Sequence, residues 1–339
     1  MRIGIANDSS IAVEVLRRAL ALRPEHTVIW VARDGAEAIS SCERATPDLL
    51  LMDLVMPGTD GVEATRRIMA ETPCAILIVT VSVGAIAAQV FEAMGCGAID
   101  AVDTPMLGRG DLQDSTATFL KKIDTVAKLV GTRKFIPSPD AFGDTWIIAR
   151  RERLVAIGAS AGGPAALSTV LSGLPEDFPA AVVIVQHVDE RFAQGMAEWL
   201  SRQCALPVRL AKEGDRPSAG TVLLAGTNDH LTFKTGERIG YTSEPREQAY
   251  RPSVDVFFAS MGALWSGEAV GVLLTGMGRD GAIGLKALRD KGCYTIAQDQ
   301  ATSTVYGMPK AAAHLGAAVD ILPLERIAPR LVDTFRHRF

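Results

Sequence analysis

The 339-residue sequence has no long hydrophobic run, no closely paired cysteines and no excess of positive charge. A membrane-spanning helix needs about 20 consecutive apolar residues, whereas the apolar runs here, such as 182-VVIV-185, have the length of a strand. We therefore expect no membrane insertion. The opening residues MRIGIANDSS place an acid where a secretory leader needs apolar residues, so we also expect no signal peptide.

The five cysteines are widely spaced and form no Cys-x-x-Cys motif. This pattern argues against a disulfide framework and against a zinc site, and it makes a cytoplasmic location the expectation. Lys and Arg number 35 against 39 Asp and Glu, so nonspecific binding to nucleic acid has no electrostatic basis. Hydrophobic residues make up 48% of the chain, which is ordinary for a folded protein.

Strand-like and helix-like segments alternate on both sides of a stretch rich in Pro and Gly, 131-GTRKFIPSPDAFGDTW-146. We predict a first domain at 1–130, a linker at 131–150 and a second domain at 151–339. The alternation predicts an α/β fold: a (βα)5 first domain and a doubly wound second domain, both with parallel sheets. The predicted strands are 2–6, 27–32, 48–53, 75–80, 98–103, 153–159, 181–187 and 269–275, and the predicted helices are 9–22, 35–45, 60–71, 84–97, 114–130, 164–174, 191–203, 280–292 and 310–318.

Acidic residues follow two strands of the first domain. Ligands of parallel α/β sheets bind beyond the carboxyl ends of the strands, and Asp8 and Asp53 both lie there. Two converging carboxylates are suitable ligands for Mg²⁺, and a carboxylate beside Mg²⁺ can accept a phosphoryl group. The alternative is that Asp53 only ends a strand and caps the turn that follows.

The segment 48-DLLLMDLVMPGTDGVEATRRI-68, together with Thr80 and an X-Pro pair at 104–105, resembles response-regulator receiver domains. The resemblance extends over all five strand–helix pairs. It implies that Asp53 accepts phosphate from a histidine kinase of the chemotaxis type. It also implies that Asp8 and Asp53 hold Mg²⁺ and that Thr80 bonds the phosphoryl oxygen.

Two positions depart from the receiver pattern. Asn7 stands where the family has an acid, although its amide oxygen can still partner the ion directly or through water. Thr104 stands where the family has a lysine. A threonine cannot offset the phosphoryl charge of about −2, so we expect phosphorylation at Asp53 with a weakened switch.

The second domain contains a candidate nucleophile in 158-GASAGG-163. This segment follows a predicted strand and opens a helix, and it matches the Gly-x-Ser-x-Gly nucleophile elbow, in which small residues permit a sharp turn that exposes the hydroxyl of Ser160. A phosphate-binding Gly-rich loop and a plain tight turn are the alternatives.

The partners expected for Ser160 lie after two other strands. His187 ends one strand and is the predicted base, with His230, in a turn-like segment, as its rival. Asp280 follows another strand and is the predicted acid, with a helix cap as its alternative role. Because each residue follows a different parallel strand, all three meet at one sheet edge, as a Ser-His-Asp triad requires. Their chain order disfavours an ordinary α/β-hydrolase esterase.

Five segments of the second domain resemble the catalytic domain of chemotaxis protein-glutamate methylesterases, the CheB family. The resemblance implies hydrolysis of glutamate methyl esters, and deamidation of glutamine, on a methyl-accepting chemoreceptor. It also implies an oxyanion hole formed by the backbone amides of Ala161 and Met277, with no cofactor beyond the Mg²⁺ of the receiver. The segments are 154-LVAIGASAGGP-164, 185-VQH-187, 251-RPSVDVFF-258, 272-VLLTGMGRDGA-282 and 305-VYGMPKAA-312.

Asn7, Thr104 and the opening helix are most similar to the Wsp-type branch of this family. That branch serves a surface-sensing receptor array that controls a diguanylate cyclase. Two other functions are the alternatives to a methylesterase: a receiver-controlled binding module with a vestigial hydrolase site, and a generic serine esterase.

Overall fold

The computed structural model describes residues 1–81, 86–105, 112–130 and 152–336. They belong to two compact units, Met1–Lys134 and Phe135–Phe339. The predicted linker at 131–150 lies outside the described residues, so its bounds stay a prediction. Within the described ranges, no helix has the length and apolar character that crossing a membrane requires.

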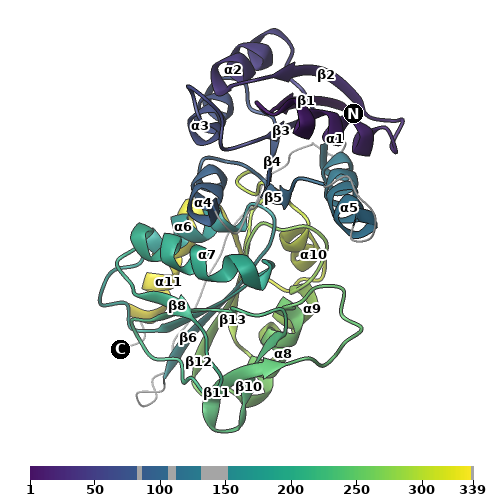
Figure 1. Ribbon diagram of the computed structural model, residues 1–339. Helices are drawn as coiled ribbons and strands as arrows, with labels where there is room; N and C mark the ends of the chain where they lie inside the picture. The colour runs from purple at the N-terminus through teal and green to yellow at the C-terminus, as the bar shows by residue number, and fades with distance from the viewer. Residues whose placement is uncertain (82–85, 106–111, 131–151, 337–339) are drawn as a thin grey trace. The chain divides into compact units, whose positions relative to one another are not determined.

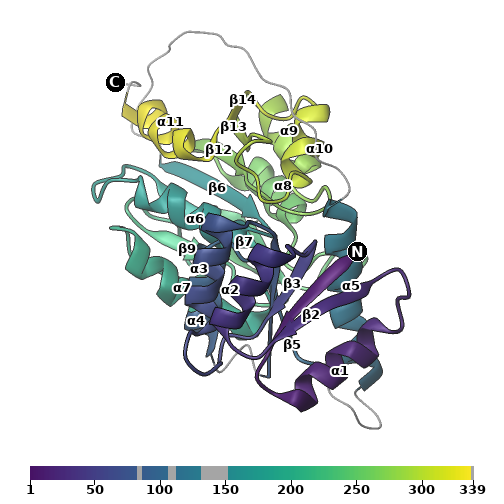
Figure 2. The same cartoon turned by 90° about the horizontal axis from the view of Figure 1, so that it is seen from above.

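The first unit is a five-stranded parallel sheet in the order β2-β1-β3-β4-β5. Helices α1 and α5 cover one face, and α2, α3 and α4 cover the other (Figures 1 and 2). Ser9 caps α1, because its side chain accepts the backbone N–H of Ala12. The elements are β1 (Arg2–Ala6), α1 (Ser10–Leu20), β2 (Thr27–Ala32), α2 (Gly35–Arg44), β3 (Leu49–Met52), α3 (Gly61–Glu71), β4 (Ala75–Thr80), α4 (Ala87–Gly95), β5 (Asp100–Asp103) and α5 (Leu112–Val130).

The second unit is a seven-stranded parallel sheet in the order β14-β13-β12-β6-β7-β9-β8, with a separate antiparallel hairpin, β10–β11. Helices α6, α7 and α11 cover one face, and α8, α9 and α10 cover the other (Figure 2). The elements are β6 (Arg153–Ala159), α6 (Gly163–Ser172), β7 (Ala181–Gln186), α7 (Glu190–Gln203), β8 (Val208–Leu210), β9 (Val222–Leu224), β10 (His230–Lys234), β11 (Arg238–Thr242), α8 (Val254–Leu264), β12 (Glu268–Leu273), α9 (Ala282–Asp290), β13 (Tyr294–Gln298), α10 (Met308–His314), β14 (Asp320–Leu322) and α11 (Leu324–Arg336).

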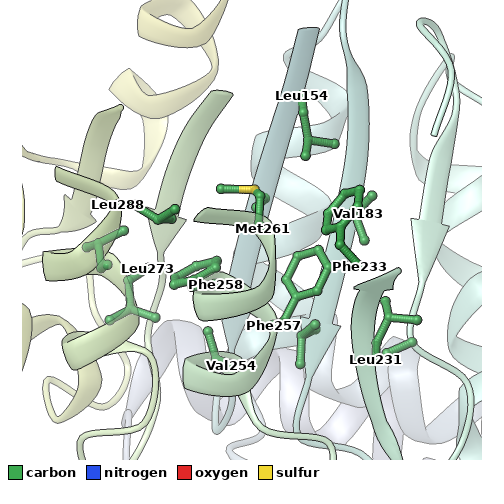
Figure 3. Packing of buried hydrophobic residues seen from close by; sticks show 14 of the residues in the cluster. Leu154, Val183, Leu231, Phe233, Val254, Phe257, Phe258, Met261, Leu273 and Leu288 are labelled. Carbon is green, nitrogen blue, oxygen red and sulfur yellow. The ribbon is translucent and has the colours of Figure 1, made fainter. Parts of the chain in front are cut away.

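Helix α8 forms the centre of the core on its side of the sheet (Figure 3). Its buried residues recur at spacings of three and four, so they line one helical face: Val254, Phe257, Phe258 and Met261. The Phe233 ring of the hairpin stacks on the Phe257 ring with centroids 5.7 Å apart. This packing holds the N-terminus of α8 beside the loop that follows β12.

Strand β6 lies where the strand order reverses. The chain leaves β6 toward β7 on one side, and β12 pairs with β6 on the other side. Such a switch point leaves a crevice beyond the carboxyl ends of the strands, and ligands of doubly wound folds bind there. A ligand site is therefore expected at the loops after β6, β7 and β12.

Candidate functional site

Ser160 lies in a sharp turn between β6 and α6. Its backbone N–H donates to the Thr275 carbonyl at 3.0 Å, and its own carbonyl accepts the Gly163 N–H at 2.7 Å. Gly162 has a φ of +74°, in the left-handed region, and a Cβ there would lie 2.6 Å from Thr304. Glycine is thus required at the turn that half-exposes Ser160 at the beginning of a helix.

His187 directly follows β7, the neighbour of β6. Its Nε2 lies 2.8 Å from Oδ2 of Asp280. Its Nδ1 is buried and has no hydrogen-bond partner among the described residues. A proton on Nε2 leaves the lone pair of Nδ1 free to accept another proton. The nitrogen that faces the carboxylate is thus Nε2, whereas in chymotrypsin-type triads it is Nδ1.

Asp280 is buried, with 5% of its surface exposed, and its carboxylate accepts four hydrogen bonds. Oδ2 accepts from His187 Nε2 at 2.8 Å and from the Val254 N–H at 2.7 Å. Oδ1 accepts from the Ser253 hydroxyl at 2.8 Å and from the Asp255 N–H at 3.2 Å. Burial opposes the charge, but the hydrogen bond and charge of His187, with the other donors, hold the pKa of Asp280 below its usual value.

Asp280 also has the alternative role of a helix cap, but it caps α8 and not α9, the helix that follows it in the chain. The N-cap of α9 is Gly281, not Asp280. Asp280 instead accepts the first backbone N–H groups of α8. The positive end of the α8 dipole therefore stabilises its charge.

His230, the rival base, is a buried structural residue. It begins β10 directly after a bend at 227–229, and it is 0% exposed. Its Nδ1 accepts the Ser253 N–H at 3.1 Å, and its Nε2 lies 3.0 Å from the Pro245 carbonyl, to which it donates. Both ring nitrogens are occupied, so His230 has no lone pair free to accept a serine proton.

The loop after β12 passes close to Ser160. A Cβ on Gly276 would lie 2.8 Å from the Ser160 Cβ, and the Thr275 hydroxyl donates to the Ala161 carbonyl at 3.0 Å. Within the described residues, the backbone N–H groups of Ala161 and Met277 donate no hydrogen bond. Two free amides beside a serine are the donors that an oxyanion requires.

Several residues of this site have no prediction of their own in the sequence. Gln186 joins two strand ends, because its Nε2 donates to the carbonyls of Ser160 at 2.9 Å and of His187 at 3.2 Å. The Ser253 hydroxyl donates a hydrogen bond to Asp280, and the Tyr250 ring stacks on the His187 ring. Gln186 and Ser253 lie in the family motifs 185-VQH-187 and 251-RPSVDVFF-258, which assigned them no role, and Tyr250 lies outside every quoted motif.

A second carboxyl, the half-buried Asp255, lies beside Asp280. Burial raises its pKa to about 6, and the charge of Asp280 contributes to the rise. Unfolded, the carboxyl ionises at about pH 4. Between these values the folded protein keeps a proton that the unfolded chain has lost, so stability falls as the pH rises through this window.

The variant Asp255→Asn removes this charge. We expect the free energy of unfolding of the variant, minus that of the wild type, to increase as the pH rises from about 4 to about 7. Denaturant unfolding at both pH values measures the difference. The same difference at both values would contradict the assignment.

The acidic residues of the first unit lie around a cavity of about 410 Å³. Its lining includes Asp8, Asp53 and Thr80, and no Lys or Arg is among the described residues that line it. Burial raises the pKa of Asp53, and the nearby charge of Asp8 raises it further, while the Thr80 hydroxyl lowers it by hydrogen bonding. A carboxylate whose pKa is raised by a neighbouring carboxylate fits a divalent cation such as Mg²⁺.

The amide of Asn7 bonds both a backbone N–H and Asp53, and the role of its oxygen toward the ion stays a prediction. That oxygen accepts the Ser9 N–H at 2.9 Å, and the amide nitrogen donates to Oδ2 of Asp53 at 3.0 Å. The amide turns this way because the backbone N–H needs an acceptor. Thr104 follows β5, where its N–H donates to the Thr80 carbonyl at 2.8 Å, and its hydroxyl is buried without a partner among the described residues.

Two protein-family models match the chain. "CheB methylesterase" matches residues 155–331, and "Response regulator receiver domain" matches residues 3–115. A protein-glutamate methylesterase/protein-glutamine glutaminase of Cupriavidus metallidurans is 63% identical over 334 residues, which cover 98% of each chain. A protein of the same name from Pseudomonas fluorescens is 59% identical over 339 residues, with 99% of each chain covered.

A solved structure supports the same assignment. The crystal structure of the Thermotoga maritima CheB methylesterase catalytic domain matches with a TM-score of 0.52 and 31% identity, and it covers 55% of this chain and 100% of that one. The predictions of an α/β two-domain fold and of a carboxylic-ester hydrolase are confirmed. The chain belongs to the CheB methylesterase family of serine-type hydrolases, with a response-regulator receiver domain ahead of the catalytic domain.

Proposed function

We propose that this chain is a protein-glutamate methylesterase and protein-glutamine glutaminase with Ser160, His187 and Asp280 as its triad. The observation that carries the proposal is the bond of 2.8 Å between His187 and the buried Asp280, at the same sheet edge as Ser160. Relatives that share most of its sequence have this name. Asp280 bonds His187 in addition to the first N–H groups of α8, so its carboxylate does more than cap a helix.

The reaction begins with proton transfer from Ser160 Oγ to Nδ1 of His187. Oγ attacks the carbonyl carbon of the ester, and the amides of Ala161 and Met277 donate hydrogen bonds to the oxyanion. The cationic His187, held by Asp280, then gives its proton to the departing methanol. Water repeats the two steps on the glutamyl-enzyme. An amide passes through the same tetrahedral intermediate and releases ammonia, which accounts for glutaminase activity.

We propose a methyl-accepting chemoreceptor as the substrate and a histidine kinase of the chemotaxis type as the phosphodonor, all in the cytoplasm. The Wsp-type branch is our proposal for the pathway, on the basis of Asn7 and Thr104. In the receiver, Asp8 and Asp53 would hold Mg²⁺, which neutralises charge during phosphoryl transfer.

Methanol release from methylated receptor tests the proposed function. The purified full-length protein should release methanol from membranes carrying methylated receptor, and a small aryl ester serves as a comparison substrate. Hydrolysis of the aryl ester without methanol release would indicate a generic esterase. Loss of both activities in a folded protein would favour the binding module.

The receiver should respond weakly to phosphorylation, because no Lys or Arg is among the described residues that line the cavity at Asp53. The variant Thr104→Lys supplies an ammonium group where the receiver family has one. We expect a phosphodonor with Mg²⁺ to change the methanol-release rate more in Thr104→Lys than in the wild type. The matched control Thr104→Ser keeps a hydroxyl and should respond as the wild type does. An equal response in all three proteins would remove this explanation.

A further inference from the structure

Tyr250 covers one face of the histidine in the proposed triad. Its ring stacks on the His187 imidazole with centroids 4.4 Å apart and an interplanar angle of 4°. Tyr250 is half-buried in the loop that leads into α8. Burial and the negative charge of Asp280 raise the pKa of its phenol, so Tyr250 is neutral at physiological pH. The imidazole therefore has a neutral aromatic wall on one face, while its Nε2 edge is bonded to Asp280.

The hydroxyl of Tyr250 reaches a second part of the site. A Cβ built on Gly278 would lie 2.7 Å from this oxygen, and Gly278 has a φ of +82°. Gly278 follows Met277, whose amide is a proposed oxyanion donor. Tyr250 thus contacts the proposed base with its ring. Its hydroxyl contacts the loop between β12 and α9, residues 274–281, which we call the oxyanion loop.

We infer that Tyr250 is a positioning residue of the proposed reaction, and the inference rests on the proposed function. One hydrogen bond to Asp280 fixes an edge of the imidazole but leaves the ring free to tilt. The stacked ring removes that freedom and directs Nδ1 toward Ser160. Because the face of an aromatic ring attracts a cation, Tyr250 also stabilises the imidazolium that forms during the reaction.

Two substitutions separate the ring from the hydroxyl. Tyr250→Leu removes the stacking face, and we expect kcat for methanol release to fall about tenfold with KM almost unchanged. Tyr250→Phe keeps the ring and should retain most of the activity. A rise in KM with kcat unchanged in Tyr250→Leu would overturn the role of the ring. Equal losses of kcat in Tyr250→Leu and Tyr250→Phe would also overturn it.

An NMR measurement on the full-length protein tests the stacking without reference to activity. In histidine-labelled protein, the ring current of Tyr250 should shift the His187 ring protons upfield, and His187→Gln identifies the signal. The shift should persist in Tyr250→Phe and disappear in Tyr250→Leu. If the wild type is active and Tyr250→Leu has the same kcat and the same His187 signals as the wild type, the inference is overturned. An inactive wild type that shows the ring-current shift would instead count against the proposed function alone.

The hydroxyl contact has its own test, a double-mutant cycle with Gly278→Ala. In the Tyr250 background the new methyl group meets the hydroxyl, whereas in Tyr250→Phe the nearest remaining ring atom is Cζ, at 3.5 Å, an ordinary contact. We expect Gly278→Ala to lower kcat severalfold more in the Tyr250 background than in the Phe background. Equal losses in the two backgrounds would overturn the contact between Tyr250 and the oxyanion loop.

Discussion

Ser160→Ala is expected to lower methanol release by about 10⁶-fold, because a triad acts as a unit and loses nearly all its advantage when the nucleophile is removed. The residual rate would come from the amides of Ala161 and Met277 and from substrate binding. The turn itself should survive, since it depends on Gly162 and on backbone hydrogen bonds rather than on the hydroxyl. Single-turnover methanol release from methylated receptor measures the effect.

The matched control is Ser201→Ala, which removes an exposed serine hydroxyl in α7. It should leave the rate unchanged, and both variants should unfold at the wild-type temperature. If folded Ser160→Ala kept more than about a tenth of the activity, the covalent serine mechanism would be abandoned.

Asp280→Asn should cost up to about 10⁴ in rate. Oδ1 of Asp280 already accepts the hydroxyl of Ser253 and the N–H of Asp255. An asparagine whose amide oxygen keeps these two donors turns its NH₂ group toward His187 and leaves the Val254 N–H without its acceptor. An imidazole that accepts from this NH₂ carries its proton on Nδ1 and cannot take the proton of Ser160.

The tautomer of His187 can be measured independently of the reaction rate. Nitrogen NMR of labelled histidine should show the His187 proton on Nε2 in the wild type and on Nδ1 in Asp280→Asn. The control Asp177→Asn changes an exposed acid in the same unit and should affect neither the rate nor the tautomer. A slow Asp280→Asn enzyme with the wild-type tautomer would show that Asp280 acts by another route.

Much of the fold is encoded in local patterns. The strand predicted at 75–80 coincides with β4, and the helix predicted at 60–71 differs by one residue from α3, because strand and helix periods are distinct. Helix α8 has no element predicted for it, since its apolar face follows a segment crowded with turn residues. The turn predicted beside His230 is present as a bend at 227–229, but His230 itself begins β10, because it pairs with β11, a contact that no local pattern specifies.

The sequence alone determined which residue types end the strands of each sheet. Because parallel strands bring their carboxyl ends to one edge, Ser160, His187 and Asp280 could be placed together from spacing. Which nitrogen of His187 faces Asp280, and which helix Asp280 caps, were decided only by the tertiary structure. The same holds for the amide orientation of Asn7 and for Tyr250 on the imidazole. Those features depend on rotamers and on packing between segments far apart in the chain, and residue order does not specify such contacts.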